Sequence, residues 1–141
     1  MMDFEKLKKI RNIGFIHEIG FELTEIREGY AKGELNLTSM HKNPIGSTHG
    51  GVIFSIADTV GGAAATSRGR AITTLSANIN YLSPAMNCEK LICEAREIKT
   101  GKRVCVYEMT VTNEFDKVIA VTTITYFYLD KNVGLPLNEE E

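Results

Sequence analysis

The segment from His41 to Ser67 constrains the fold more than any other part of the chain. Charged residues make up 24% of the whole sequence, yet between Asn43 and Ser67 the one charged residue is Asp58. From Gly51 onward, apolar residues recur at the i, i+3, i+4 spacing of a helix, at Val52, Ile53, Ile56, Ala57, Val60, Ala63 and Ala64. The other positions are small, so the sequence predicts a central helix that is buried nearly all round.

Asp58 lies in the middle of this predicted helix. An unpaired buried carboxylate is costly, so a lone acid in such a helix indicates a functional site. The structural alternative is a buried acid satisfied by a neighbouring Ser or Thr, or by Arg68.

The start of the central helix carries a second functional signal. Ser47 or Thr48 is the predicted N-cap, and His49, Gly50 and Gly51 then fill the first turn, where backbone N–H groups have no partner within the helix. Glycine lets a ligand approach these groups closely, and the helix dipole favours a negative oxygen there. The alternative is that the glycines serve tight packing and that His49 is a structural hydrogen-bonding residue. An oxyanion site together with a buried acid is typical of acyl transfer.

Length, charge and cysteine content exclude several classes of protein. The 141 residues predict one domain, and a net charge of −2 gives no reason to expect nucleic acid. The N-terminal sequence is too charged for a secretory signal, and no uncharged run is apolar enough to span a membrane. The cysteines Cys88, Cys93 and Cys105 are odd in number and form no CxxC pair, which predicts reduced thiols and a cytoplasmic protein.

The segments around the central helix predict a short N-terminal helix and a set of strands. The short helix spans Asp3–Asn12 and ends at Gly14, and Gly69 ends the central helix. The strands span Phe21–Arg27, Ala31–Thr38, Thr73–Leu82, Leu91–Lys99, Val104–Asn113 and Val118–Leu129. Two strands, one long helix and a meander of four strands predict an α+β fold, with one antiparallel sheet wrapped around one helix.

Two of these strands have informative patterns. Thr73–Leu82 alternates between apolar and polar residues, which predicts a half-buried strand. Val118–Leu129 is apolar or Thr at nearly every position, so both of its faces are expected to be covered, one by the helix and the other by another subunit.

These residues also resemble a known family, the hotdog-fold acyl-CoA thioesterases of the PaaI type, within the 4-hydroxybenzoyl-CoA thioesterase-like superfamily. The resemblance covers about Gly20 to Leu129 and is carried by Asn43, Gly46, His49, Gly50, Gly51, Asp58, Ser76 and the run Asn80-Tyr81-Leu82-Ser83-Pro84. It implies a hotdog thioesterase domain over 15–130, preceded by an accessory helix over 1–14 and followed by a tail over 131–141. The NEEE sequence of the tail is expected to be disordered.

The resemblance implies a role for each matched residue. Asp58 would be the catalytic carboxylate, as general base on water or as nucleophile, and the Gly50 N–H would polarise the thioester carbonyl. Asn43 would hold the thioester or the attacking water, with His49 near the carbonyl and Ser76 beside the carboxylate. An acyl-CoA would be cleaved to acid and thiol with no metal and no cofactor, by homodimers that pair into tetramers.

Asn43 and Ser76 each have a structural reading. Asn43 precedes Pro44 in a loop, where Asn commonly forms turns, and Ser76 is one of several hydroxyl residues on a polar strand face.

Basic residues are the candidates for binding the polyanionic coenzyme A. Lys102 lies in the predicted turn Thr100-Gly101-Lys102 and Arg103 follows it, and with Gly51 and Ser76 they complete the predicted substrate-binding set. The alternative for the basic residues is a solvated charged face.

Rival catalytic motifs are missing, and two other functions stay open. The three histidines have no metal-ligand spacing such as HExxH, and neither GxSxG nor GxGxxG occurs. A hotdog hydratase or dehydratase would act on the same thioesters, but resembling enzymes place a catalytic His before a separate acid in another motif. A non-catalytic acyl-CoA-binding module would need neither Asn43 nor an acid in the helix.

The spacing of Gly50 and Asp58 predicts a dimer. Eight residues of helix span about 12 Å at 1.5 Å per residue, so one carbonyl cannot contact both residues of the same chain. The acid is therefore expected from a second, antiparallel copy of the helix, with a two-fold axis near Phe54. Each of two sites would combine Asn43, His49 and Gly50 of one chain with Asp58 of the other.

Overall fold

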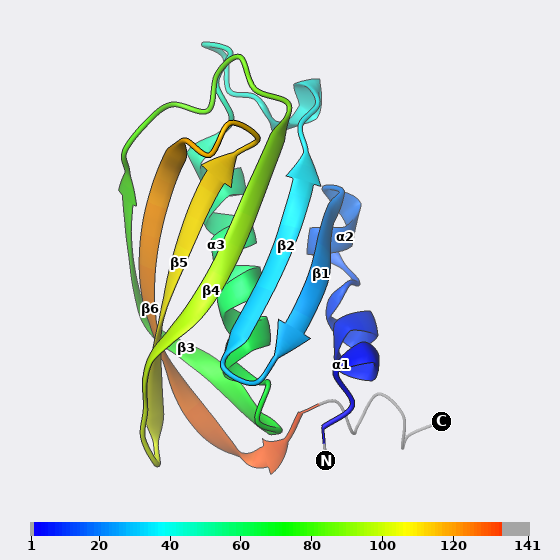
Figure 1. The fold of residues 1–141 in the computed structure, drawn as a ribbon, viewed down its shortest axis with the longest axis vertical. Coiled ribbons are helices and arrows are strands. Elements are labelled where there is room, and N and C mark those ends of the chain that lie inside the picture. The colour runs from blue at the N-terminus through cyan, green and yellow to red at the C-terminus, as the bar shows by residue number, and fades with distance from the viewer. Residues whose placement is uncertain (1, 134–141) are drawn as a thin grey trace.

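The computed structural model describes residues 2–133 and confirms the α+β prediction of one antiparallel sheet wrapped around one long helix (Figure 1). The helices are α1 (Phe4–Arg11), α2 (Phe15–Glu18) and α3 (Gly50–Ala65), and a short 3₁₀ helix covers Ser39–His41. The strands are β1 (Phe21–Arg27), β2 (Tyr30–Asn36), β3 (Arg70–Tyr81), β4 (Lys90–Thr100), β5 (Val104–Asn113) and β6 (Val118–Asn132).

The strand order is β1-β2-β4-β5-β6-β3, with every pairing antiparallel. The predicted meander of four strands is wrong in one respect, because β3 pairs with β6 at the edge of the sheet. From β3 the chain passes over the end of the sheet to reach β4 (Figure 1). Three strand spacings of about 4.8 Å separate β3 from β4, and the segment 82–89 is long enough to cover them.

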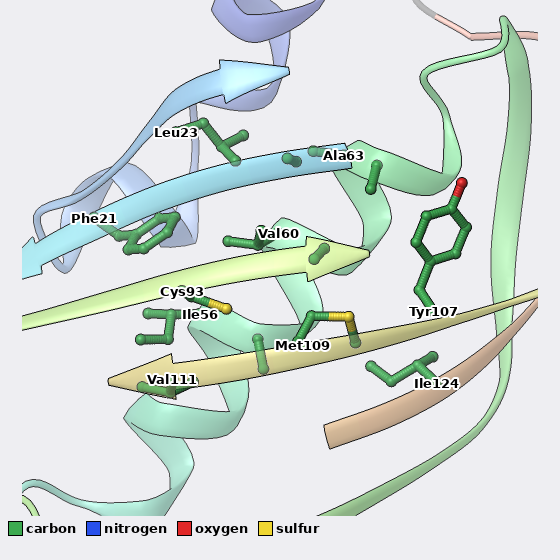
Figure 2. Packing of buried hydrophobic residues seen from close by; sticks show 14 of the residues in the cluster. Phe21, Leu23, Ile56, Val60, Ala63, Cys93, Tyr107, Met109, Val111 and Ile124 are labelled. Atoms are coloured by element: carbon green, nitrogen blue, oxygen red, sulfur yellow. The ribbon is translucent and has the colours of Figure 1, made fainter. Parts of the chain in front are cut away.

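The C-terminal half of α3 packs closely against the sheet. Every residue from Val60 to Ala65 is buried, and Figure 2 shows Val60 and Ala63 within the same cluster as Met109 of β5 and Ile124 of β6. A Cβ atom added at Gly61 would lie 2.8 Å from the Cε atom of Met109 and would also collide with the Tyr126 hydroxyl. The small residues are therefore required for the helix to approach the strands.

The N-terminal half of α3 has one open face, so the predicted burial all round is wrong for the single chain. The residues on this open stripe, at i, i+3, i+4, i+7 and i+8, are exposed or half-buried: Gly51, Phe54, Ser55, Asp58 and Thr59.

Strand β3 differs from its prediction in the same way. Its residues from Thr73 to Asn78 are exposed, and Leu75 is 57% exposed, whereas a half-buried strand was expected. As an edge strand it has no neighbour beyond it. Within residues 2–133 no element buries the apolar side chains of this strand that the sequence pattern predicted to be buried.

The ends of the helices also differ from the predictions. Helix α1 ends at Arg11 with Asn12 as C-cap, and Gly14, at a φ of +74°, begins the short α2 that the sequence did not predict. Helix α3 ends at Ala65 with Thr66 as C-cap, so Gly69 does not end it but lies in the turn before β3. The Thr66 hydroxyl bonds back to the last turn of the helix and ends it earlier.

The remaining predictions on the chain as a whole concern its ends, its thiols and its division. All three cysteines are free thiols, and no helix within residues 2–133 has the length and apolar character needed to cross a membrane. The division at 1–14, 15–130 and 131–141 stays a prediction, and the NEEE sequence lies outside the described residues.

Candidate active site

His49 is the N-cap of α3, where Ser47 or Thr48 was expected. Its Nδ1 atom accepts a hydrogen bond of 2.8 Å from the Gly51 N–H. The two predicted caps are used elsewhere, because the Ser47 hydroxyl accepts from the Asn43 amide and the Thr48 hydroxyl donates to the Ala85 carbonyl. The helix is thus capped by an imidazole nitrogen and not by a hydroxyl oxygen of Ser47 or Thr48.

The Gly50 N–H is a free donor at the start of this helix. Among the hydrogen bonds of residues 2–133 none uses it, whereas the next N–H, that of Gly51, is already bonded to His49. The Tyr81 hydroxyl donates to the Gly50 carbonyl at 2.8 Å, and a Cβ at position 50 would lie 3.2 Å from that hydroxyl oxygen. The free N–H carries the positive end of the helix dipole, which makes it suited to a negative oxygen.

A cavity of about 420 Å³ opens beside this helix start. Its size is in the range of small-molecule sites. The residues that line it come from the first turn of α3 and the residues just before it, and from the end of β3 and the chain that follows: Ser47, Thr48, His49, Gly50, Gly51, Ile53, Tyr81, Leu82, Ser83, Pro84 and Ala85. The structure therefore brings together three of the predicted site residues, His49, Gly50 and Gly51.

Asn43 lies in the loop before the cavity. Its amide nitrogen donates to the Ser47 hydroxyl at 3.0 Å, and its Oδ1 accepts from the Ile45 N–H at 3.1 Å. These bonds are those of a turn-forming Asn, and they also connect the side chain to the first residue that lines the cavity. A role for Asn43 in chemistry stays a prediction.

Asp58 lies on the open stripe of α3, two turns beyond the cavity, and is half-buried. Within residues 2–133 its carboxylate forms no hydrogen bond and no ion pair. The alternative partner proposed from sequence, Arg68, instead forms ion pairs with Glu97 and Glu28. Burial raises the pKa of Asp58, and the positive charge of Arg11 partly offsets that rise.

Ser76 is exposed on the edge strand β3, just after a bulge. It pairs with Thr125, whose neighbours Ile124 and Tyr126 are buried, so Ser76 lies on the outer face of the sheet. In the single chain, Ser76 is therefore not placed beside the carboxylate of Asp58, and its predicted role stays a prediction.

The basic candidates Lys102 and Arg103 lie at the opposite end of the sheet from the start of α3 (Figure 1). With Arg70 they line a second cavity of about 570 Å³. The guanidinium of Arg70 donates to the Lys102 carbonyl at 3.0 Å and stacks over the ring of Tyr128 at 4.5 Å. The structure thus adds an arginine to the predicted pair but separates all three from Gly50 in one chain.

Two residues with a place in the site were not identified from the sequence. Tyr81 belongs to the run Asn80-Tyr81-Leu82-Ser83-Pro84 that carries the family resemblance. Its hydrogen bond to the Gly50 carbonyl, however, depends on where the end of β3 lies relative to the start of α3. Arg11 lies in a charged segment with no distinctive motif, and its position near Asp58 is a tertiary effect. No group of three or more potential metal ligands among His, Cys, Asp and Glu occurs in the part of the chain described here.

The chain is similar to known proteins over most of its length. Residues 45–120 match the family model of the thioesterase superfamily. The acyl-coenzyme A thioesterase PaaI of Escherichia coli K12 is 30% identical over 103 residues, which are 73% of this chain and 74% of that protein.

Solved structures agree with this match and with the predicted hotdog fold. The structure of the E. coli PaaI protein from the phenylacetic acid degradation operon has a TM-score of 0.84 at 25% identity and covers 91% of this chain and 96% of its own. A Streptococcus mutans protein bound to acetyl-CoA has a TM-score of 0.76 at 29% identity, with 84% and 98% covered. The hotdog fold is confirmed.

The raised pKa of Asp58 predicts how its replacement affects stability. The ionised carboxylate is less favourable in the folded than in the unfolded chain. This cost is absent below the unfolded-state pKa of about 3.9, where both states are protonated, grows as the pH rises to the folded-state pKa, and is constant above it. We expect Asp58→Asn to be at least as stable as the wild type in urea at pH 7, with the difference lost near pH 3.

The matched control for this measurement is Asp130→Asn, which removes an exposed carboxylate at the end of β6. A loss of more than about 1 kcal/mol at pH 7 in Asp58→Asn alone would mean that the ionised carboxylate stabilises the fold.

Proposed function

The chain belongs to the thioesterase superfamily, and on that premise we propose that it is an enzyme that hydrolyses acyl-CoA thioesters to a free acid and coenzyme A. The observation that carries the proposal is the free Gly50 N–H at a helix N-terminus, opening on a cavity of about 420 Å³. A relative with this similarity is named an acyl-coenzyme A thioesterase, and a structural neighbour binds acetyl-CoA.

The proposed reaction uses Gly50 and Asp58. The Gly50 N–H donates to the thioester carbonyl oxygen and stabilises the negative charge that develops there. Asp58 acts as general base, taking a proton from water as its oxygen attacks the carbonyl carbon, or as the nucleophile itself. On the general-base route the carbon–sulfur bond then breaks, the thiol of coenzyme A leaves with the proton that Asp58 took, and the free acid remains. On the nucleophilic route the Asp58 carboxylate forms a mixed anhydride with the acyl group as the thiol of coenzyme A leaves, and water then hydrolyses the anhydride to the free acid and restores Asp58.

We further propose that each active site is shared between two chains. The eight-residue spacing of Gly50 and Asp58 keeps them about 12 Å apart along α3. The open stripe of α3 and the unpaired edge of β3 both need cover, because a twelve-residue edge strand presents a row of unpaired backbone groups. A two-fold axis near Phe54 would cover both and place the partner's acid at this chain's cavity. Pairing of such dimers gives the predicted homotetramer.

The same two-fold axis explains the distant basic residues. Antiparallel helices bring the end of one chain that carries Lys102, Arg103 and Arg70 to the end of the other that carries Gly50. These three side chains would then bind the phosphates of coenzyme A from across the interface. A cytoplasmic location fits the free thiols, two of which, Cys93 and Cys105, are buried.

Replacing Asp58 by Asn tests the proposed activity. The change keeps the shape of the side chain and removes the base or nucleophile, so release of thiol from a panel of acyl-CoAs should be abolished. Thiol release is followed with a thiol reagent, and the control is Asp116→Asn, which removes an exposed carboxylate between β5 and β6. Turnover of Asp58→Asn within tenfold of the wild type would refute the assignment, and saturable acyl-CoA binding without turnover in the wild type would favour a non-catalytic module.

Replacing Gly50 by Pro tests the oxyanion role. Proline is tolerated at the first position of a helix but has no N–H, so kcat should fall by about 10² or more with a smaller change in KM. Gly50→Ala is the matched control, because it keeps the N–H and adds the same Cβ near Tyr81. Equal activity in the two variants would assign Gly50 to packing alone.

A further inference from the structure

Arg11, the last residue of α1, reaches the central helix. A Cβ atom added at Gly62 of α3 would lie 2.8 Å from Nη2 of Arg11, so the guanidinium lies directly over that glycine. Gly62 follows Asp58 by four residues, which places the two positions one turn apart on the same face of the helix. The accessory helix thus brings a positive charge to the part of α3 that carries the acid.

The guanidinium of Arg11 forms no hydrogen bond or ion pair within the described residues. Its Nε atom is enclosed and has no hydrogen-bond partner within residues 2–133, and neither has the enclosed Tyr126 hydroxyl. In the same part of the chain no ion pair joins Arg11 to any acid. Enclosing part of a cation without a direct partner is costly, which indicates that the charge of this half-buried side chain serves something other than packing.

Asp58 and Tyr126 are the titratable groups whose charges affect the pKa of Arg11, and Arg11 is the group whose charge affects the pKa of Asp58. The pKa of Tyr126 of β6 depends in turn on the charges of Asp58, Arg11, Cys105 of β5 and Cys93 of β4. Burial raises the pKa of Tyr126 and of Cys93, so all but Asp58 and Arg11 are neutral at physiological pH. Arg11 and Asp58 therefore form an isolated pair of opposite charges.

Asn12 fixes Arg11 in this place. Its side chain accepts from the Leu23 N–H at 2.8 Å and donates to the Leu23 carbonyl at 3.2 Å, which ties the end of α1 to β1. Leu7 of the same helix is buried in the core. The helix that carries the charge is thus anchored on both sides of its last turn.

We propose that Arg11 is a positioning residue whose fixed positive charge keeps the Asp58 carboxylate ionised for hydrolysis. The proposal rests on the proposed role of Asp58. Because the two groups form no direct ion pair, both carboxylate oxygens stay free to take a proton or to attack the substrate. The accessory helix α1 is thereby part of the site.

Three variants of the full-length protein test this inference. Arg11→Met removes the charge and keeps an apolar side chain, Arg11→Lys keeps the charge, and Lys9→Met removes an exposed charge from the same helix as a control. Loss of the charge should raise the pKa of Asp58, so the acidic limb of kcat/KM should move to higher pH in Arg11→Met. At the wild-type midpoint its kcat/KM should fall by about threefold or more, with near-normal activity well above the midpoint. Arg11→Lys and Lys9→Met should follow the wild type.

A second readout does not depend on activity. The side-chain carboxyls of the four aspartates are labelled with ¹³C and titrated by NMR, and the Asp58 signal is assigned by its loss in Asp58→Asn. A higher Asp58 pKa in Arg11→Met supports the inference, even where the rate profile is unmoved and the proposed role of Asp58 fails. An unchanged Asp58 pKa, or an equal shift in Lys9→Met, overturns it. Arg11→Gln replaces Arg11→Met if that chain does not fold.

Discussion

Close packing of α3 against the curved sheet is the constraint on which the rest of the structure depends. A side chain at Gly61 would collide with Tyr126 of β6 and Met109 of β5, so the helix can approach the strands this closely only with a small residue there. That approach buries the C-terminal half of α3, and the rise of the helix sets the distance from its first turn to Asp58. Because the packed helix is rigid, the positions of the Gly50 N–H and the Asp58 carboxylate relative to each other are fixed.

The rise of α3 separates the functional groups of one chain, and in the proposed function a second chain completes each site. The free N–H of Gly50 and the free carboxylate of Asp58 lie on one helix at a distance that no carbonyl can bridge. The proposed two-fold axis would cover both the open stripe of α3 and the exposed edge of β3. A carboxylate on such a stripe loses more of its water when a partner covers it, which raises its pKa further. A nearby positive charge such as that of Arg11 then contributes more to keeping the carboxylate ionised.

Local sequence patterns predicted much of the fold and less of the site. Periodicity alone located the central helix and gave the bounds of Phe21–Arg27 and Val104–Asn113 as observed. It did not predict that β3 pairs with β6, because alternation specifies a strand but not its neighbour. The exposure of β3 was missed because alternation predicts that one face of a strand is buried without showing which element buries it. The N-cap role of His49 and the reach of Arg11 depend on tertiary contacts that leave no periodic signal.

Subunit complementation tests the shared site most directly. Gly50→Pro and Asp58→Asn chains, each expected to have little or no activity alone, are unfolded and refolded together in equal amounts, and subunit mixing is verified with a mass tag on one chain. Random pairing makes half of the dimers mixed, and each mixed dimer has one intact site and one doubly altered site. Activity should therefore return to about a quarter of the wild type. Mixed dimers without any activity would contradict a site built from two chains.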